Sequence, residues 1–400
     1  MAKQQFDRIY FDYNATAPIR EAVIDAVQKA MRIPSNASSI HTEGRQARAN
    51  IENCRRKLAL SINNPKAMIV FTSSATESIQ LALDPHLKHE GSRFNSWKLL
   101  TTPVEHSAVL VGGRFEKEQI SFVKVKETGV VDLRDLSYQL ERFAKDSPDK
   151  GVIISIQYAN SETGIIQPIK EISDIVHKYN YLLHCDAVQA YGRCSLDMSE
   201  LGIDMMSLSA HKMGGPLGVG ALVCASDHIR PTPLLKGGGQ ERGLRSGTEN
   251  STAIIGFSAA IECFQQSPFL DQLEDLRKAF EDKISHEMPE VEIIGRDNER
   301  MAGTTSLALP QISASSLLMQ LDLMGISVST GSACSSGKVS KSHVLKAMNI
   351  DDELSSRVIR ISGGHETSQE HYDRAFDALK SIYMKLLHRS EIQDKSVKID

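Results

Sequence analysis

Five polar side chains that can do chemistry follow apolar, strand-like runs, at the points where each run gives way to small residues and turn formers. They are Thr76, His106, Asn160, Asp186 and Lys212. Open α/β sheets bind ligands at the carboxyl ends of their strands, so these groups are expected to lie together at one edge. Each has an ordinary structural explanation when taken alone. The prediction of an active site therefore rests on the placement of all five residues at the same edge of the sheet.

Lys212 follows the run 204–209, which stops at Ser209, and precedes Gly214-Gly215-Pro216. An amine that is desolvated in a crevice loses its proton more easily, and a neutral lysine can form a Schiff base with an aldehyde. The alternative is a solvated loop lysine, which is common on protein surfaces. This stretch by itself leaves both interpretations open.

Small hydroxylated residues, Thr72 to Thr76, connect the run 68–71 to a helical pattern. They offer N–H and O–H donors and the positive end of a helix dipole, which is what a phosphate site needs. The alternative is an ordinary Ser/Thr helix cap with Glu77 in the first turn.

Asp186 ends a buried run, and Gln189 follows it closely. A carboxylate in this place could keep a protonated ring nitrogen charged, as an electron-sink cofactor requires, or it could simply cap the next helix. His106 could stack on a ring or move a proton, and the alternative is a structural histidine.

Cys334 lies among Gly, Ser and Ala residues that offer too little apolar surface to bury it. An exposed thiol on a loop is the usual setting of a reactive cysteine. The other five cysteines, at positions 54, 185, 194, 224 and 263, show no close C-x-x-C pairing and indicate reduced thiols. No metal site is predicted.

Strand-like runs alternate with helical patterns along the chain, which predicts an α/β fold with a mostly parallel seven-stranded sheet. The runs are 67–71, 98–102, 120–125, 152–157, 181–185, 204–208 and 219–224, and the helices between them include 77–88, 105–118, 132–145 and 168–180. Later helices at 248–265, 268–287, 313–324, 341–348 and 367–388, with runs at 290–294, 304–309, 326–330 and 357–362, predict a smaller α+β domain. We place the large domain at 15–260 and the small C-terminal domain, which carries the Cys334 loop, at 261–400 together with 1–14. The charged tail after His388 is predicted to fray.

The composition is that of a globular protein with more than one core, since 400 residues are 41% hydrophobic and 24% charged. The net charge of −4 gives no electrostatic reason to expect direct binding of nucleic acid or of an anionic membrane. No run approaches the roughly 18 apolar residues of a membrane span, and the N-terminus has no apolar signal core. A cytoplasmic location is therefore expected.

Taken together, these residues resemble the cysteine desulfurases of the NifS/IscS type, which are pyridoxal-phosphate-dependent members of the class-V aminotransferase family. The resemblance runs in order from about Phe11 to Thr367. It rests on Ala75-Thr76-Glu77, His106, Asn160, Asp186-Ala-Val-Gln189, Ser209-Ala-His211-Lys212, the stretch 237–248, Gly331-Ser-Ala-Cys334-Ser and Ile359-Arg360. It implies a homodimer with the fold of type-I pyridoxal-phosphate transferases. It also implies conversion of L-cysteine to L-alanine, with the sulfur passed as an enzyme persulfide to an acceptor protein.

The resemblance further implies a role for each matching residue. Binding of pyridoxal 5′-phosphate would fall to Ala75, Thr76, His106, Asn160, Asp186, Gln189, Ser209, His211, Lys212 and, from the partner subunit, Thr248. Within this set Lys212 would hold the cofactor covalently, Asp186 would pair with the ring nitrogen, and His106 would stack on the ring. The substrate carboxylate would bind Asn160 and Arg360, and the catalytic residues would be Cys334, Lys212 and His106.

Three departures from the family pattern indicate a divergent member. Met213-Gly-Gly-Pro216 follows Lys212, Ser362-Gly-Gly-His365 stands where Ser-Leu-Gly-Arg is usual, and Ser73-Ser74 replaces a more frequent glycine. No catalytic group is lost, but the sulfur acceptor stays open among proteins of iron–sulfur cluster assembly, tRNA thiolation and DNA phosphorothioation.

The alternative functions are another enzyme on this fold, an aminotransferase or lyase, and a non-catalytic scaffold. The presence of Cys334 argues against an aminotransferase or lyase, because those reactions need no mobile thiol. Loss of Lys212 or Cys334 would have favoured the scaffold, and both residues are present.

Overall fold

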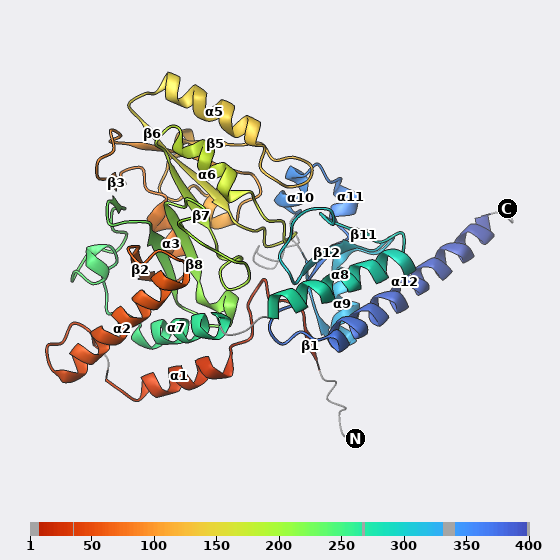
Figure 1. The fold of residues 1–400 in the computed structure, drawn as a ribbon. Coiled ribbons are helices and arrows are strands. Elements are labelled where there is room, and N and C mark those ends of the chain that lie inside the picture. The colour runs from red at the N-terminus through yellow and green to blue at the C-terminus, as the bar shows by residue number, and fades with distance from the viewer. Residues whose placement is uncertain (1–7, 35, 266–268, 331–340, 398–400) are drawn as a thin grey trace. The chain divides into compact units, whose positions relative to one another are not determined.

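The computed structural model describes residues 8–34, 36–265, 269–330 and 341–397, with side chains up to residue 388 (Figure 1). The chain divides into two compact units. The larger unit comprises Thr16–Asn160 and Ile166–Ser267, and the smaller unit comprises Met1–Ala15, Ser161–Ile165 and Pro268–Asp400. Each unit has its own cluster of buried apolar side chains.

A seven-stranded sheet forms the centre of the larger unit, in the order β2-β9-β8-β7-β6-β4-β5. Strands β4 to β8 pair in parallel, and β9 is antiparallel to both of its neighbours, which confirms the predicted mostly parallel sheet. Most strand residues are buried, which explains why the strands read as continuous apolar runs. The strands are β2 (Met68–Thr72), β4 (Trp97–Thr101), β5 (Ile120–Phe122), β6 (Gly151–Gln157), β7 (Leu182–Asp186), β8 (Met205–Ser209) and β9 (Gly220–Cys224).

Two groups of helices lie along opposite flanks of this sheet (Figure 1). One group is α1 (Glu21–Met31), α2 (Thr42–Ser61) and α7 (Ser251–Gln265), and the other is α5 (Leu133–Asp146) and α6 (Ile169–His177). Helix α3 (Ala75–Ala82) packs on β8 and β9. The short elements are β3 (Lys88–His89), α4 (Ser107–Leu110), η1 (Lys117–Gln119), η2 (Ala210–Met213), β10 (Ile229–Arg230) and η3 (Glu241–Gly243).

The helix predicted over 105–118 is wrong in extent, because the only α-helix described there is the short α4, and the 3-10 helix η1 overlaps the end of the range. Gly112 and Gly113 have φ values of 81° and 60°, left-handed conformations that end the helix and turn the chain.

The smaller unit is built on a four-stranded antiparallel sheet in the order β11-β12-β15-β14. Its strands are β11 (Glu292–Ile293), β12 (Thr304–Ala308), β14 (Ser329–Thr330) and β15 (Val358–Ser362), and β1 (Ile9–Tyr10) pairs separately with β13 (Ile326–Ser327). Its helices are α8 (Phe269–Glu287), α9 (Ala314–Leu323), α10 (His343–Ala347), α11 (Asp352–Ser355) and α12 (Gln369–Val397). Helix α12 continues past His388, where the sequence predicted a frayed tail.

The division between the units differs from the boundary expected after residue 260. That point lies inside α7, and the division follows Ser267 instead. Residues Ser161–Ile165 belong to the smaller unit, where Ile165 pairs with Arg300 in an isolated antiparallel bridge.

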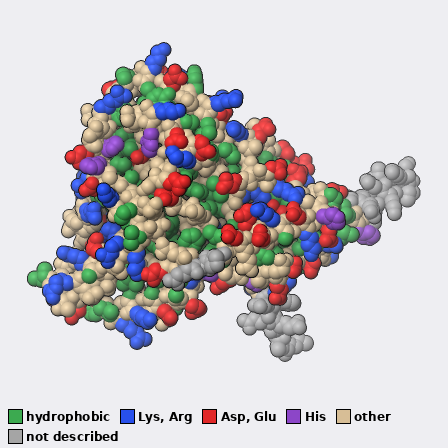
Figure 2. All heavy atoms as spheres, in the orientation of Figure 1, with side chains coloured by type: hydrophobic (Ala, Val, Ile, Leu, Met, Phe, Trp, Pro, Cys, Tyr) green, Lys and Arg blue, Asp and Glu red, His purple; other side chains and the backbone are tan. Residues whose placement is uncertain are grey.

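Within the described ranges, no helix combines the length and apolar character needed to cross a membrane. Side chains of Lys and Arg are interspersed with those of Asp and Glu on the face drawn in Figure 2.

Candidate active site

The carboxyl edge of the central sheet brings the ends of four strands side by side. The register places Gln157 beside Asp186, and Asp186 beside Ser207. Thr72 and Ser209, the last residues of β2 and β8, both lie opposite Gly220 at the start of β9. The predicted residues that follow these strands therefore gather at one edge.

The turn from β2 into α3 lies directly against Gly220. A Cβ on Gly220 would come within 2.7 Å of the Ser74 carbonyl carbon and 2.9 Å of the Ala75 nitrogen, so glycine is needed for this approach. The Oγ of Ser74 accepts a hydrogen bond from the Glu77 N–H at 3.2 Å, so the helix-cap interpretation holds for this serine. Ala75 is buried and Thr76 is exposed at the start of α3, where free N–H groups suit an anion.

Glu77 joins this turn to the loop that carries Thr248. Its Oε2 accepts hydrogen bonds from the N–H and the hydroxyl of Ser73 at 2.8 and 2.5 Å, and its Oε1 accepts from Arg245 at 2.9 Å. Burial raises the pKa of Glu77, but the bonds from Arg245 and Ser73 outweigh it and the pKa is lowered overall. Thr248 is exposed and, with Ser73 and Arg245, lines a hollow of about 180 Å³. Ser73, one of the departures from the family pattern, thus adds a hydroxyl contact to this network.

Asp186 lies within electrostatic reach of both His106 and Lys212. It is buried at the end of β7 and accepts a hydrogen bond from the Val188 N–H at 3.1 Å. Burial raises the pKa of Asp186, while that hydrogen bond and the positive charges of His106 and Lys212 act in the opposite direction. A carboxyl group in such surroundings keeps its charge best beside a cation.

Arg193, which the sequence did not single out, connects two of the predicted residues. Its Nε and Nη2 donate to the carbonyl oxygen of Lys212 at 3.0 and 2.7 Å, and its Nη1 donates to Oε1 of the buried Gln189 at 3.1 Å. One guanidinium thus fixes the backbone of Lys212 relative to the side chain of Gln189. The only sequence signal for Arg193 is its position four residues after Gln189.

Two buried titratable groups near this edge favour their neutral forms. Burial raises the pKa of Glu105 to about 8, although Thr102 donates to its Oε1 at 2.6 Å. Burial lowers the pKa of His184 to about 3, and its ring lies between the hydroxyls of Ser155 and Ser207 at 2.9 Å each. The sequence assigned a role to neither residue.

His211 is also neutral near pH 7. Its Nδ1 is 2.8 Å from the hydroxyl of Thr16. Burial, followed by the charges of Lys212 and Arg193, lowers its pKa to about 4. The neighbouring Ser209 is buried at the end of β8.

Asn160 ties the end of β6 to the segment before His106. Its Nδ2 donates to the carbonyl oxygen of Val104 at 3.0 Å, and Nε2 of Gln157 donates to the same oxygen at 2.7 Å. His106 caps the N-terminus of α4, and its Nδ1 accepts from the Ala108 N–H at 3.1 Å.

Arg360 belongs to the smaller unit, on strand β15. Its Nη2 donates to Asp12 at 2.5 Å and its Nη1 donates to the carbonyl oxygen of Ser161 at 2.9 Å. Its buried Nε has no hydrogen-bond partner among the described residues, which leaves a donor for a further acceptor. The sequence did not identify Asp12 as a partner. Cys334 lies outside the described residues.

Comparison with known proteins extends over nearly the whole chain. The family description Aminotransferase class-V matches residues 9–374. Cysteine desulfurase IscS of Dictyoglomus turgidum is 37% identical over 387 residues, which cover 94% of this chain and 95% of that protein. A NifS-like protein from Rickettsia africae has a TM-score of 0.83 and 31% identity, and the match covers 94% of this chain and 99% of that one. The structure of SspA in complex with cysteine has a TM-score of 0.74 and 28% identity, with 88% and 98% coverage.

Proposed function

The chain belongs to the class-V aminotransferase family, among the cysteine desulfurases of the NifS/IscS type, and on this basis we propose the reaction of this protein. It converts L-cysteine to L-alanine and passes the sulfur, as a persulfide on Cys334, to an acceptor protein. The substrate assignment is supported by the relatives' names and by the similar SspA structure that contains cysteine.

The donor set at the edge of the central sheet fits pyridoxal 5′-phosphate. This cofactor, when bound, supplies an aldehyde for an amine and a protonated ring that withdraws electrons from the substrate. Lys212 would hold it covalently, Asp186 would pair with its ring nitrogen, Gln189 would bond its phenolic oxygen, and His106 would stack on its ring. Its phosphate would bind at Ala75, Thr76, Ser209 and His211.

The remaining roles are those that the resemblance implies, and the residue types are consistent with them. Arg360 and Asn160 would hold the substrate carboxylate. The Nε of Arg360, which has no hydrogen-bond partner among the residues that the structure describes, supports this role. The amine of Lys212 would take the α-proton. The thiolate of Cys334 would attack the substrate sulfur, and the carbon–sulfur bond would break with its electron pair left on carbon, which then takes up a proton.

The observation that carries the proposal is the buried Asp186 within electrostatic reach of Lys212 and His106. The test is release of alanine and sulfide from L-cysteine with a reductant, compared between the wild type and Cys334→Ala. Loss of activity in the variant, with the yellow colour of the bound cofactor retained, is the expected result. Equal activity in both proteins would remove Cys334 from the reaction and return the assignment to an aminotransferase or lyase.

We also propose a homodimer in which Thr248 reaches the phosphate bound by the partner subunit. The exposure of Thr248 supports this arrangement. Mixing Lys212→Ala with Thr248→Ala protein should then restore one fully equipped site in each mixed dimer. No recovery of activity above that of either variant alone would contradict the shared site.

The acceptor is proposed to be a protein of iron–sulfur cluster assembly, tRNA thiolation or DNA phosphorothioation, of which the IscS names of the relatives favour the first. The five described cysteines outside the Cys334 loop are free thiols, which supports a reducing compartment such as the cytoplasm. Transfer of radioactive sulfur from the persulfide to purified candidate acceptors distinguishes these pathways.

A further inference from the structure

Residues Ser161–Ile165, called here the 161–165 segment, follow directly after Asn160 and are held at their far end by the loop before β12. Ile165 pairs with Arg300, and the Met301 N–H donates to the Gly164 carbonyl oxygen at 2.9 Å. Gly164 has a φ of 78°, and a Cβ there would come within 2.8 Å of the Thr304 side chain. The segment therefore follows one path against this loop.

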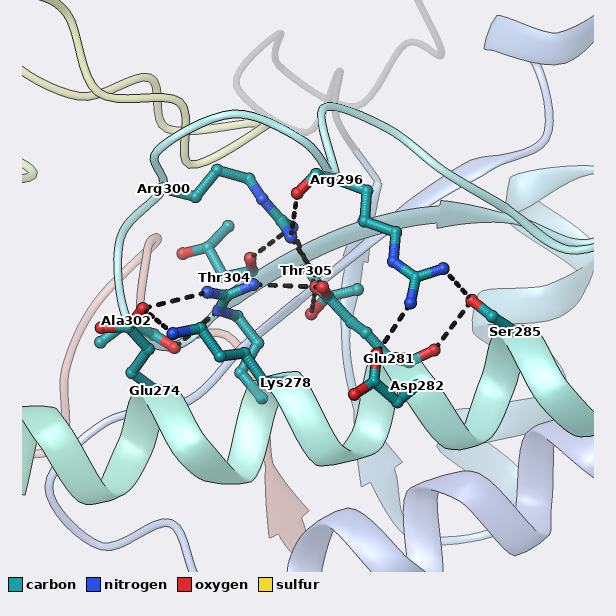
Figure 3. Close-up of polar contacts among 11 residues, drawn as sticks. Glu274, Lys278, Glu281, Asp282, Ser285, Arg296, Arg300, Ala302, Thr304 and Thr305 are labelled. Carbon is teal, nitrogen blue, oxygen red and sulfur yellow. Dashed lines mark hydrogen bonds and ion pairs between the residues drawn. The ribbon is translucent and has the colours of Figure 1, made fainter.

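The loop itself is fixed by a buried ion pair (Figure 3). Arg300 donates from Nη1 and Nη2 to the two carboxylate oxygens of Glu281 in α8, at 2.9 and 2.6 Å. The hydroxyl of Thr305 in β12 donates to the same carboxylate at 2.7 Å. The loop that supports the 161–165 segment is thus bonded to α8, and α8 to β12.

The near end of the segment is bound to Arg360. The carbonyl oxygen of Ser161 accepts from Nη1 of Arg360 at 2.9 Å and from Nδ2 of Asn14 at 3.0 Å. The backbone carbonyl of Ser161, which a change of the Glu162 side chain leaves in place, therefore takes part in orienting the arginine assigned to the substrate carboxylate.

Between these two ends, Glu162 reaches the start of α10. The hydroxyl of Ser342 donates to Oε2 of Glu162 at 2.6 Å, and both side chains are buried. The same hydroxyl caps α10 by accepting from the Leu345 N–H at 3.1 Å. Burial raises the pKa of Glu162, while the Ser342 bond and the charges of His343 and Arg360 act against it. Glu162 thus connects the 161–165 segment to the helix that follows Cys334 in the sequence.

The chain before Cys334 is attached to the same place. Ser329 in β14 lies opposite Arg360 in β15, and Thr330 lies opposite Ile359. The described residues on both sides of the stretch 331–340 are therefore anchored close to Arg360, one through β-pairing and the other through Glu162.

We propose that Glu162 is a positioning residue for sulfur transfer, which fixes the start of α10 through Ser342 and so holds the chain bearing Cys334 in register with Arg360. The inference rests on the proposed desulfurase function. Loss of the Glu162 side chain is expected to slow the step in which the thiol attacks and to leave the binding of cofactor and substrate intact.

The test compares Glu162→Ala and Ser342→Ala with Ser313→Ala. Ser313 caps α9 in the same unit by accepting from the Ser316 N–H, without contact to Glu162, so its variant controls for the loss of a helix cap. The measurements are the cofactor absorbance change on adding L-cysteine, kcat and KM, and the rate of persulfide formation on Cys334 by mass spectrometry. We expect kcat and the persulfide rate to fall on the order of 10-fold to 100-fold in both variants, as for a misplaced reactive group, with KM and the absorbance change unaltered.

Glu162→Gln retains an acceptor oxygen and is expected to keep most of the wild-type rate. The double variant Glu162→Ala/Ser342→Ala should lose no more of kcat than either single variant, because both substitutions remove the same hydrogen bond. The proposal would be overturned if Glu162→Ala and Ser342→Ala were no slower than Ser313→Ala, or if only their KM changed. It would also be overturned if the losses of kcat in the double variant were additive. Absence of any persulfide in the wild type would instead show that the proposed function is wrong, and the inference would fall with it.

Discussion

Replacing Glu281 by glutamine should destabilise the smaller unit by about 3–5 kcal/mol, the cost of breaking a buried ion pair. The carboxylate is 3% exposed and accepts hydrogen bonds from Arg300, Arg277 and Thr305, so two guanidiniums share one buried negative charge (Figure 3). The amide keeps the shape but turns an N–H₂ group toward guanidinium donors. With a loss of about 3 kcal/mol, the ratio of folded to unfolded protein falls by roughly two powers of ten.

The pH dependence of this loss has a definite sign. Burial raises the pKa of Glu281, but the hydrogen bond and charge of Arg300, the Thr305 hydroxyl and the charge of Arg277 outweigh it and lower the pKa overall. A carboxylate with a lowered folded-state pKa stabilises fully above its unfolded value of 4.5 and loses this contribution as the pH falls through the folded value. The difference between the wild type and Glu281→Gln should therefore be complete at pH 7 and shrink in acid.

Asp282→Asn provides the matched control, because Asp282 is 73% exposed and pairs with Arg296 at the surface. Its loss should be within about 1 kcal/mol. Hydrogen exchange followed by mass spectrometry reports on the two units separately, and fluorescence of Trp97, the single tryptophan, reports on the larger unit. Peptides from α8, β12 and β15 should lose protection in Glu281→Gln while those from β6 to β8 keep theirs. A loss no greater than that of Asp282→Asn would refute the reasoning.

Two further predictions concern the edge of the central sheet. Gly220→Ala should displace the Ser74–Ala75 turn, because the added Cβ would meet backbone atoms of that turn at 2.7 and 2.9 Å. The substitution should cost about 1–3 kcal/mol of stability and weaken cofactor binding in an absorbance titration. Unchanged cofactor affinity would contradict this placement of the phosphate turn. Glu105, whose pKa is raised from 4.5 to about 8, makes the folded wild type lose stability as pH rises between those values, because the folded protein holds a proton that the unfolded chain releases. Glu105→Gln should remove this slope in urea denaturation at pH 5, 7 and 9, and an unchanged slope would show that another group causes it.

Much of the larger unit follows from local pattern. All seven predicted runs form strands of the central sheet, because a strand buried on both faces leaves a continuous apolar run in the sequence. The end of β7 at Asp186 and the end of β8 shortly before Lys212 follow from the same pattern. The helix expected over 105–118 fails because its apolar spacing did not reveal that Gly112 and Gly113 turn the chain.

The sequence alone determined which residue types stand at the ends of the strands, since periodicity and turn chemistry act over a few neighbouring positions. It did not determine which polar groups meet across the chain. Arg300 on Glu281, Arg193 on the Lys212 carbonyl and Ser342 on Glu162 all depend on segments that come together only when the apolar faces are buried. Burial then obliges each enclosed polar group to find a partner, and the tertiary structure decides which one it finds.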